Sequence, residues 1–356
     1  MFERHRLHKM ISHGLQLFLL ISFATAVAKA KQLTIMNNPP KVLVTNPTVP
    51  SIGIELLTEK GCQVIIVENE SREEILKKVK GVDAVFWFSH EKFSNDILDA
   101  AGSQLKVIGT MSAGYNHFNL DELKKRGIKL GNTPKVLNEA VADVAILLSL
   151  AASRRIQEGR LAIENNQWKN TDAQWLLGTD IANSTVGIIG LGGIGQAIAK
   201  RLKGFDVKQV LYTGHKEKPE GEELGAKFVS LDTLNRESDF IIVAVPLTNE
   251  TNGMCNEDFF SKMKKTAVFI NVSRGQVVDQ PALIDALKNG TIFAAGLDVM
   301  TPEPLPSDHE MLKLPNLVVL PHIGSATKNT RDAMSTLTAQ NILRGLGGEE
   351  MFTPVV

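Results

Sequence analysis

A glycine-rich turn between an apolar strand and a helix constrains the fold of this chain more than any other feature. The run Gly190-Leu-Gly192-Gly-Ile-Gly195 follows a short apolar segment, residues 186–189, and precedes a helix-capable segment, residues 196–203. In that context the first glycine allows a tight turn, the second admits a pyrophosphate to the backbone, and the third lets helix and strand pack closely. The helix N-terminus adds free N–H donors and the positive end of its dipole. The sequence therefore predicts a unit that binds a dinucleotide.

Short apolar runs alternate with polar, helix-capable stretches on both sides of this turn. Such alternation is typical of parallel sheets with helices on both faces, whose strands are apolar almost throughout. We therefore predict an α/β protein with two Rossmann-like doubly wound parallel-sheet domains. The predicted strands are residues 41–46, 62–67, 84–88 and 106–110 in a first series and 185–189, 210–213, 240–245, 267–272, 293–297 and 317–320 in a second, with long helices at 139–165 and 328–346.

Length, charge and cysteine content limit the other classes. The 356 residues suffice for about two domains, and a hydrophobic content of 43% can build their cores. Lys and Arg together number 39, as do Asp and Glu, so the net charge is zero. We therefore expect no nucleic-acid partner and no membrane partner for the mature domain. Cys62 and Cys255 form neither a disulfide framework nor a metal-binding spacing, so we expect no metal and favour a reducing compartment.

The N-terminus has the pattern of a targeting segment. Basic residues precede an apolar run at residues 15–28 that ends in small residues, as in a secretory signal, and the scarcity of acids also fits a mitochondrial presequence. A glycosylation sequon at Asn271 lies inside the predicted active site and argues against secretion. We therefore treat residues 1–39 as an N-terminal extension or targeting segment. The cytosol is the expected location, with a signal peptide or a mitochondrial presequence as the alternative.

The second strand of the nucleotide unit ends without the acid that binds the ribose 2′-hydroxyl of NAD in other proteins. The residues that follow it are Gly214, His215 and Lys216, and the first acid, Glu217, comes late. Gly214 leaves room, and His215, Lys216 and Lys218 can pair with a 2′-phosphate. We therefore predict NADPH as the preferred cofactor, with NADH possible. The alternative is an ordinary solvated loop, in which exposed lysines are common.

Three strands of the second series end near charged or titratable residues. Arg274 follows the fourth strand of that series, and His322 follows the last. Asp298 and Glu303 follow the strand between them. Because ligands of open parallel sheets bind outside the carboxyl ends of the strands, we expect these side chains to meet in the cofactor cleft. Taken singly, each could be an ordinary surface or turn residue.

Their chemistry suits the reduction of a 2-keto acid, and Arg274, Glu303 and His322 are the predicted catalytic residues. Arg274 can hold the substrate carboxylate and polarise the keto oxygen with its planar guanidinium. His322 can donate the proton that this oxygen takes up as carbon 2 is reduced. Glu303 can accept from the other ring nitrogen, which fixes the tautomer and favours the protonated ring. Asp298 is placed for the nicotinamide carboxamide.

The motifs around these residues resemble those of the D-isomer-specific 2-hydroxyacid dehydrogenases. They are Asn271-Val-Ser-Arg274-Gly, Gly296-Leu-Asp298-Val-x-x-x-Glu303-Pro and Leu320-Pro-His322-Ile-Gly-Ser325-Ala-Thr. The similarity extends over residues 41–348. It is strongest to the glyoxylate/hydroxypyruvate reductase branch, through Thr110-Met-Ser-Ala-Gly114, Leu211-Tyr-Thr-Gly214 and residues 320–327. The resemblance implies an NAD(P)-dependent oxidoreductase that reduces glyoxylate or hydroxypyruvate, a small 2-keto acid, to glycolate or D-glycerate.

The resemblance also implies a division of the chain. Residues 40–140, completed by 321–356, would form the substrate domain, residues 141–320 the NAD(P)-binding Rossmann domain, and two copies a homodimer. The backbone amides of Ala113 and Gly114 would hold the substrate carboxylate, beside Arg274, His322 and Ser325. Together with the turn and the loop discussed above, the predicted dinucleotide-binding set is Gly190, Gly192, Gly193, Ile194, Gly195, Gly214, His215, Lys216, Pro246, Val272, Asp298 and Gly324.

Some positions depart from the family pattern and leave alternatives open. Asn116 stands where many members have aspartate, Asp143 where many have glutamate, and the segment 168–175 has a composition that can alter substrate selection. One alternative is another D-2-hydroxyacid dehydrogenase of the phosphoglycerate or formate type, although formate enzymes have glutamine where Glu303 stands. The other is a dinucleotide-sensing protein that resembles the C-terminal-binding-protein corepressors and has no turnover.

Overall fold

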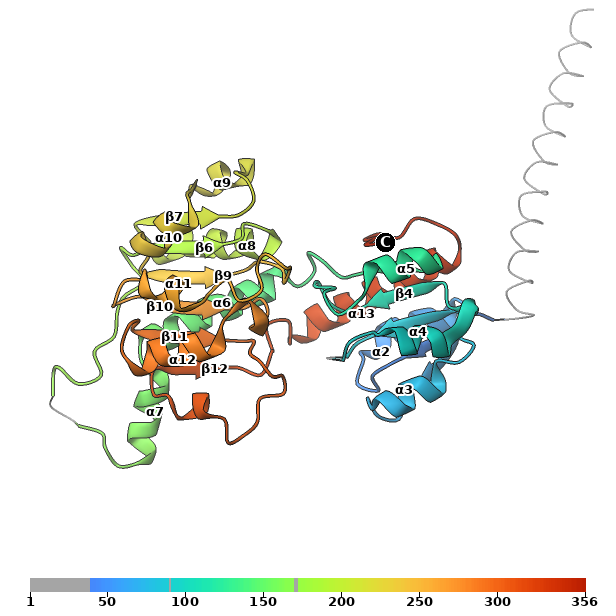
Figure 1. Ribbon diagram of the computed structural model, residues 1–356, viewed down its shortest axis with the longest axis horizontal. Coiled ribbons are helices and arrows are strands. Elements are labelled where there is room, and N and C mark those ends of the chain that lie inside the picture. Colours follow the sequence, from blue (N-terminus) through green and yellow to red (C-terminus); the bar gives the residue numbers. More distant parts are fainter. Residues whose placement is uncertain (1–38, 90, 170–171) are drawn as a thin grey trace, which may run out of the picture.

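The computed structural model describes residues 39–89, 91–169 and 172–356. Two α/β units lie side by side in it, each built on one parallel sheet (Figure 1). The predicted fold class is therefore confirmed. The predicted N-terminal targeting segment lies outside the described residues, apart from Pro39.

The first unit has a five-stranded sheet in the order β2-β1-β3-β4-β5. Its elements are β1 (Lys41–Val44), α2 (Ser51–Glu59), β2 (Gln63–Ile66), α3 (Arg72–Lys78), β3 (Ala84–Trp87), α4 (Asn95–Ala101), β4 (Val107–Thr110), α5 (Leu120–Arg126) and β5 (Lys129–Gly131). Strand β3 is buried along its whole length because its side chains alternate between two cores. Val85 and Trp87 belong to one core, and Ala84 and Phe86 to the other.

The second unit has a seven-stranded sheet in the order β12-β11-β10-β9-β6-β7-β8. Its elements are β6 (Thr185–Ile189), α8 (Gly193–Leu202), β7 (Gln209–Thr213), α9 (Pro219–Leu224), β8 (Ala226–Phe228), α10 (Leu231–Glu237), β9 (Phe240–Val243), α11 (Glu257–Ser261), β10 (Val268–Asn271), α12 (Gln280–Lys288), β11 (Ala294–Leu297) and β12 (Leu317–Val319). The strand order reverses between β6 and β9. In sheets of this class the ligand crevice opens at that point, outside the carboxyl ends of the strands.

Two long helices connect the units. Helix α6 (Asn138–Ser153) packs on α8, β10 and β11 of the seven-stranded sheet. Helix α13 (Lys328–Leu346) follows the last strand of that sheet but packs on α2, β3 and β4 of the other unit (Figure 1). The last residues stay there, since the Val355 N–H donates to the Leu130 carbonyl at 2.7 Å. The C-terminal residues therefore pack on the unit that the first strands form.

The structure differs from the predicted elements in three places. Strands β5 and β8 were not predicted, because three residues each are too few to show a pattern. The helix expected at 139–165 is two helices, α6 and α7 (Ile156–Glu164), since Arg155 between them has φ 55°, in the left-handed region that stops a helix. Helix α8 begins at Gly193, so the glycine turn itself supplies the first helical residues.

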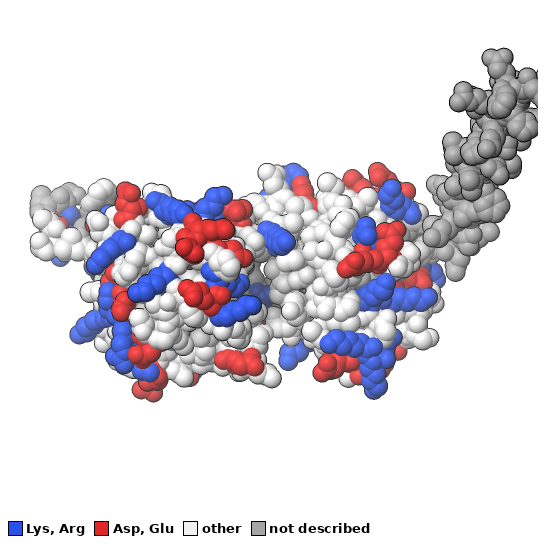
Figure 2. Space-filling model, turned by 90° about the horizontal axis from the view of Figure 1, so that it is seen from above, with Lys and Arg blue, Asp and Glu red and all other residues white. Residues whose placement is uncertain are grey.

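Neither sign of charge dominates the face of the molecule drawn in Figure 2. Lys and Arg are interspersed there with Asp and Glu, in line with the equal numbers of basic and acidic residues in the sequence. Across the described ranges no helix is both long and apolar enough to cross a membrane. The same residues contain no group of three or more His, Cys, Asp or Glu side chains arranged to hold a metal ion.

Candidate active site

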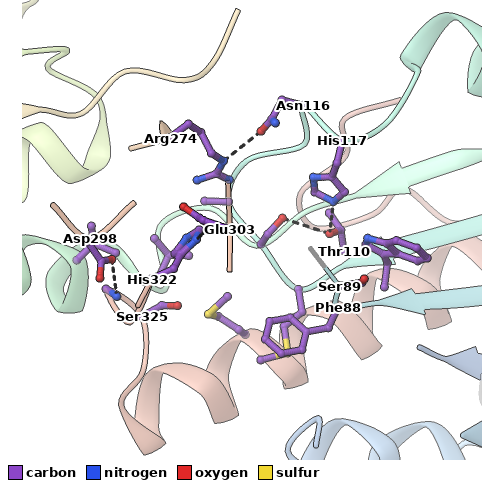
Figure 3. Close-up of a pocket in the computed structure, with 18 of the residues that line it drawn as sticks. Phe88, Ser89, Thr110, Asn116, His117, Arg274, Asp298, Glu303, His322 and Ser325 are labelled. Atoms are coloured by element: carbon purple, nitrogen blue, oxygen red, sulfur yellow. Dashed lines mark hydrogen bonds and ion pairs between the residues drawn. The ribbon is translucent and has the colours of Figure 1, made fainter. Parts of the chain in front are cut away.

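A cavity of about 540 Å³ lies where the carboxyl ends of the two sheets face each other. Arg274, Asp298, Glu303 and His322 line it from the seven-stranded unit, as do Ile194 and Val272. The five-stranded unit contributes residues that include Phe88, Thr110, Ala113 and His117, and α13 contributes Arg331 and Met334. In Figure 3 Arg274, Glu303 and His322 stand together on one side, opposite Phe88, Thr110 and His117. The structure therefore brings the predicted catalytic residues into one cavity.

The histidine is held by a carboxylate. His322 Nδ1 lies 2.8 Å from Glu303 Oε2, and both side chains are partly buried. The other oxygen of Glu303 accepts from the Met300 N–H at 2.9 Å, which fixes the carboxylate in turn. This arrangement directs the other ring nitrogen, Nε2, away from Glu303, because the two nitrogens lie on opposite sides of the imidazole.

Asp298 shapes the loop that presents His322. Its side chain is 2% exposed, and its two oxygens accept from the Ile323 and Gly324 N–H groups at 2.8 Å each. Its carbonyl accepts from the His322 N–H at 2.9 Å, and His322 is held at φ 54°. Burial raises the pKa of the Asp298 carboxyl, and the two backbone hydrogen bonds oppose that shift. The predicted contact of Asp298 with the nicotinamide stays a prediction.

Arg274 projects from a turn that its neighbours build. The Asn271 side chain accepts from the Ser273 N–H at 3.0 Å and donates to the Arg274 carbonyl at 3.0 Å. The guanidinium donates to the Ser273 carbonyl at 2.8 Å and to Asn116 Oδ1 at 3.2 Å (Figure 3). Burial lowers the pKa of Arg274, while the charge of Glu303 raises it. The guanidinium remains protonated at neutral pH, because arginine keeps its charge in proteins.

The loop after β4 meets Arg274 across the cavity. A Cβ atom on Gly114 would lie 2.2 Å from Arg274 Nη2, so any larger residue there would displace the guanidinium. The Ala113 carbonyl accepts from Asn132 Nδ2 at 2.7 Å, and the Gly114 carbonyl accepts from Ser112 Oγ. Within the described part of the chain, neither the Ala113 nor the Gly114 N–H donates to a backbone or side-chain acceptor. Two free amides beside a guanidinium fit a carboxylate. Ser325, the other predicted substrate residue, also lines the cavity.

The glycine turn has the shape that a dinucleotide requires. Gly190 has φ 98°, and a Cβ there would lie 2.8 Å from the Ala244 carbonyl oxygen. A Cβ on Gly195 would lie 2.1 Å from the Gly190 oxygen, so the helix packs closely on the turn. Nothing lies within 4 Å of a Cβ on Gly192, the residue expected to face the pyrophosphate. The turn is thus tight on the protein side and open toward the N-terminus of α8, as an anion site should be.

The other predicted dinucleotide residues also lie at strand ends. Gly193 and Ile194 begin α8, Pro246 follows β9, Val272 follows β10 and Gly324 follows β12. Gly214, His215 and Lys216 follow β7 and are exposed, and a Cβ on Gly214 would meet nothing within 4 Å. Lys218 Nζ donates to the Leu191 carbonyl at 3.0 Å and so ties this loop to the glycine turn.

Sequence reasoning missed several polar residues of the cavity. Thr110 Oγ1 lies 3.2 Å from Ser112 Oγ and 3.4 Å from His117 Nε2. Trp87 is fully buried, and its Nε1 has no hydrogen-bond partner among the described residues. The signal for Thr110 and Ser112 was their position at the end of a predicted strand. Arg331 gave no signal, because it lies in a helix whose pattern indicated only packing.

Comparison with known proteins adds independent evidence. Residues 146–324 match the NAD-binding domain of the D-isomer specific 2-hydroxyacid dehydrogenases. The chain is 49% identical over 316 residues to a glyoxylate reductase/hydroxypyruvate reductase of Homo sapiens, covering 87% of this chain and 96% of that one. It is 44% identical over 317 residues to a glyoxylate reductase of Thermococcus kodakarensis, with 87% and 94% covered.

Solved structures show the same similarity. An NADPH-dependent glyoxylate/hydroxypyruvate reductase of Sinorhizobium meliloti, in complex with NADP and malonate, is 34% identical. Its TM-score is 0.77, with 89% of this chain and 97% of that chain covered. A second protein, TT0316 of Thermus thermophilus, is 39% identical with a TM-score of 0.80, over 89% of this chain and 100% of that chain.

Proposed function

Because the chain belongs to the D-isomer-specific 2-hydroxyacid dehydrogenases and is an NAD(P)-dependent oxidoreductase, we propose that it reduces glyoxylate and hydroxypyruvate to glycolate and D-glycerate. We further propose NADPH as its preferred cofactor. The observation that carries the proposal is the cavity in which the His322–Glu303 pair and Arg274 stand beside the glycine turn. The names of the relatives support the choice of substrate.

In this mechanism the protein holds the substrate by its carboxylate. The amides of Ala113 and Gly114 and the guanidinium of Arg274 bind the substrate carboxylate, and Arg274 also polarises the keto oxygen. The cofactor, when bound along the glycine turn, supplies the hydride for carbon 2. His322 Nε2 donates a proton to the keto oxygen, where negative charge grows during reduction. Glu303, 2.8 Å from Nδ1, keeps the ring oriented and stabilises its protonated form.

The loop after β7 supports the preference for NADPH. It presents Gly214, His215 and Lys216 to solvent and has no acid where an NAD-binding protein places one. Basic side chains there favour a 2′-phosphate, and an acid would repel it. Lys218 lies beside the glycine turn and adds positive charge at the same end of the site.

A panel of small 2-keto acids, assayed with NADPH and with NADH, tests this function. We expect glyoxylate and hydroxypyruvate to give the highest kcat/KM, and NADPH to exceed NADH for both. Absence of turnover with every 2-keto acid would refute the reductase and leave a dinucleotide-sensing protein. Equal or better efficiency with NADH would refute the cofactor preference alone.

We also propose the domain division and a homodimer. Substrate-domain residues 40–140 and 321–356 would enclose the five-stranded sheet, and residues 141–320 the nucleotide-binding sheet. Large apolar side chains exposed on and after α6 and α7 support a contact with a second copy: Leu147, Ile156, Ile163, Trp168 and Leu177 are all more than half exposed. Light scattering on the purified protein should give twice the mass of one chain. A monomer at micromolar concentration would contradict this.

Finally, we propose the cytosol as the location of the mature enzyme. Both cysteines are free and buried, as is usual for proteins of a reducing compartment. Sequencing the N-terminus of the mature protein from fractionated cells tests this. Removal of about the first thirty residues, together with recovery from an organelle or the medium, would favour the targeting alternatives.

A further inference from the structure

The segment that follows β5 is bonded to the loop after β4. Asn132 and Thr133 are both buried, with 6% and 0% of their surfaces exposed. The Thr133 N–H donates to the Ser112 carbonyl at 2.9 Å, and Asn132 Nδ2 donates to the Ala113 carbonyl at 2.7 Å. Two successive carbonyls of the loop are therefore held by two successive residues of this segment.

These hydrogen bonds set the direction of the two free amides of the loop. The Ser112 carbonyl and the Ala113 N–H belong to one peptide unit, and the Ala113 carbonyl and the Gly114 N–H belong to the next. Both units are trans, so each N–H points away from the carbonyl of its own unit. Because both carbonyls are bonded to Asn132 and Thr133, both N–H groups point away from that segment.

Asn132 is held in turn by residues from the far end of the chain. Its carbonyl accepts from Thr353 Oγ1 at 2.6 Å and from Asn341 Nδ2 at 3.1 Å, and its N–H donates to the Thr353 carbonyl at 3.2 Å. Asn341 lies in α13 and is fully buried. Its side chain also donates to Thr353 Oγ1 at 2.8 Å and accepts from the Thr353 N–H at 3.2 Å. The three residues thus form one hydrogen-bond network.

Close packing leaves this network little room to move. A Cβ on Gly131, the residue before Asn132, would lie 2.8 Å from Met351 Sδ and 2.9 Å from Asn341 Cγ. Gly131 also forms an antiparallel bridge with Pro354. Donors that are fixed before a ligand arrives bind it better than mobile ones, because their ordering no longer opposes binding.

We propose that Asn132 is the positioning residue for the substrate carboxylate, and that Thr353 holds Asn132 in place. Without the bond from Asn132 Nδ2, the peptide unit between residues 113 and 114 can turn its carbonyl toward the substrate. A carbonyl and a carboxylate are both acceptors, so no hydrogen bond forms between them. All 2-keto acids share the carboxylate, so Asn132 affects the binding of each one equally. The inference deepens the proposed function and rests on it for the identity of the acid.

Asn132→Asp tests this role, because it keeps the shape of the side chain but replaces the donor by an acceptor. We expect KM for glyoxylate and for hydroxypyruvate to rise by the same factor, about 10–100-fold, the effect of losing hydrogen bonds to a charged group. The kcat values should stay within about threefold, as for an interaction that acts in binding alone. Fluorescence titration should give an unchanged Kd for NADPH. An unchanged KM, or a fall in kcat alone, would overturn the proposal.

Asn316→Asp is the matched control. Asn316 Nδ2 also donates to backbone carbonyls, those of Leu287 at 3.2 Å and Phe293 at 3.1 Å. Asn316 precedes β12 and so lies at the amino end of the strands, whereas the cavity lies at their carboxyl ends. Its variant should lose stability in thermal denaturation without a change in KM for either acid. The same rise in KM in both variants would assign the effect to a general loss of stability and overturn the proposal.

Thr353 allows a milder test of the same network. Thr353→Val removes the hydroxyl that donates to the Asn132 carbonyl, and Thr353→Ser keeps it. We expect KM for both acids to rise about 3–10-fold in the valine variant, the effect of one lost hydrogen bond, and to stay within about twofold in the serine variant. If Asn132→Asp does not fold, this pair decides the question. Equal KM values in the two variants would contradict the role of Thr353.

A binding measurement keeps this inference separate from the proposed activity. NADPH does not reduce glycolate, so isothermal titration of glycolate into the protein with NADPH measures carboxylate binding without turnover. Asn132→Asp should weaken glycolate at least tenfold, and Asn316→Asp should leave it unchanged. If the wild-type protein turns over no keto acid, the proposed function fails, and this titration still decides whether Asn132 positions the amides. Equal affinity of Asn132→Asp and the wild-type protein would refute the inference.

Discussion

The turn after β6 and the loop after β4 both follow buried parallel strands, yet their glycines serve different partners. A Cβ on Gly192 would meet nothing within 4 Å, so the space beside it is open to a ligand. A Cβ on Gly114 would lie 2.2 Å from Arg274 Nη2, so the space beside it is filled by a side chain of the other unit. The two parallel sheets thus form one site, in which one glycine leaves room for a ligand and the other leaves room for a side chain.

The residues proposed for the chemical step follow the same division. Arg274, Asp298, Glu303 and His322 all come from the seven-stranded unit, whereas the loop after β4 offers backbone amides. The comparison predicts that changes on the seven-stranded side affect the chemical step or the cofactor. Changes on the five-stranded side should affect the binding of the substrate carboxylate.

The largest effect is expected at His322. Its φ of 54° lies in the left-handed region, which asparagine tolerates better than alanine, so His322→Asn removes the proton donor with the least strain. We expect kcat with hydroxypyruvate to fall about 10²–10⁴-fold, the usual contribution of a positioned acid. Fluorescence titration should give an unchanged Kd for NADPH. A kcat within tenfold of wild type would show that a group other than His322 donates the proton.

A pair of glycine substitutions separates packing from binding in the turn after β6. Gly195→Ala places a Cβ 2.1 Å from the Gly190 oxygen, and backbone cannot easily move away. We expect a loss of about 1–3 kcal/mol in the free energy of unfolding, measured by denaturant titration. Gly192→Ala should fold with the stability of wild type but raise the Kd for NADPH about tenfold or more, because its methyl group occupies ligand space. Equal stability of the two variants would contradict the packing argument.

The corresponding change in the other loop is Gly114→Ala. Its Cβ would meet Arg274 Nη2, the end of a flexible side chain, so the guanidinium shifts while the fold remains. We expect KM for glyoxylate to rise about tenfold with a smaller change in kcat, as for a residue that acts mainly in binding. Steady-state kinetics at saturating NADPH measure both. A large fall in kcat with unchanged KM would show that Gly114 affects the chemical step and not substrate binding, and would contradict the proposed difference between the two sides of the site.

The smallest effect is expected at the cofactor-selecting loop. Gly214→Asp places a carboxylate after β7, where nothing lies within 4 Å of the new Cβ. We expect the NADPH-to-NADH ratio of kcat/KM to fall about tenfold, because the acid repels a 2′-phosphate and accepts from a 2′-hydroxyl. Gly204→Asp is the control, since it also has room for a Cβ but follows the C-terminal end of α8, away from the glycine turn. The same shift in both variants would show a general charge effect.

Much of the fold followed from local patterns. The alternation of apolar runs predicted ten of the strands, because strands covered on both faces need apolar side chains along their whole length. The hydrophobic pattern did not predict β5 and β8, because these strands are too short to show one. It also did not predict the end of α6 at Arg155, because the helical pattern continues through that residue. The left-handed conformation of a residue such as Arg155 cannot be read from the hydrophobic pattern, because it depends on how the helices before and after that residue pack.

By itself the sequence determined the class of the site. The glycine turn and the positions of Arg274, Glu303 and His322 at strand ends are local facts, and the carboxyl ends of parallel strands necessarily share one edge. Only the tertiary structure decided what faces them. The fit of Arg274 against Gly114 and the arrival of Arg331 beside Phe88 join segments as much as about 240 residues apart. Such contacts depend on how the two units pack, and no local pattern encodes that.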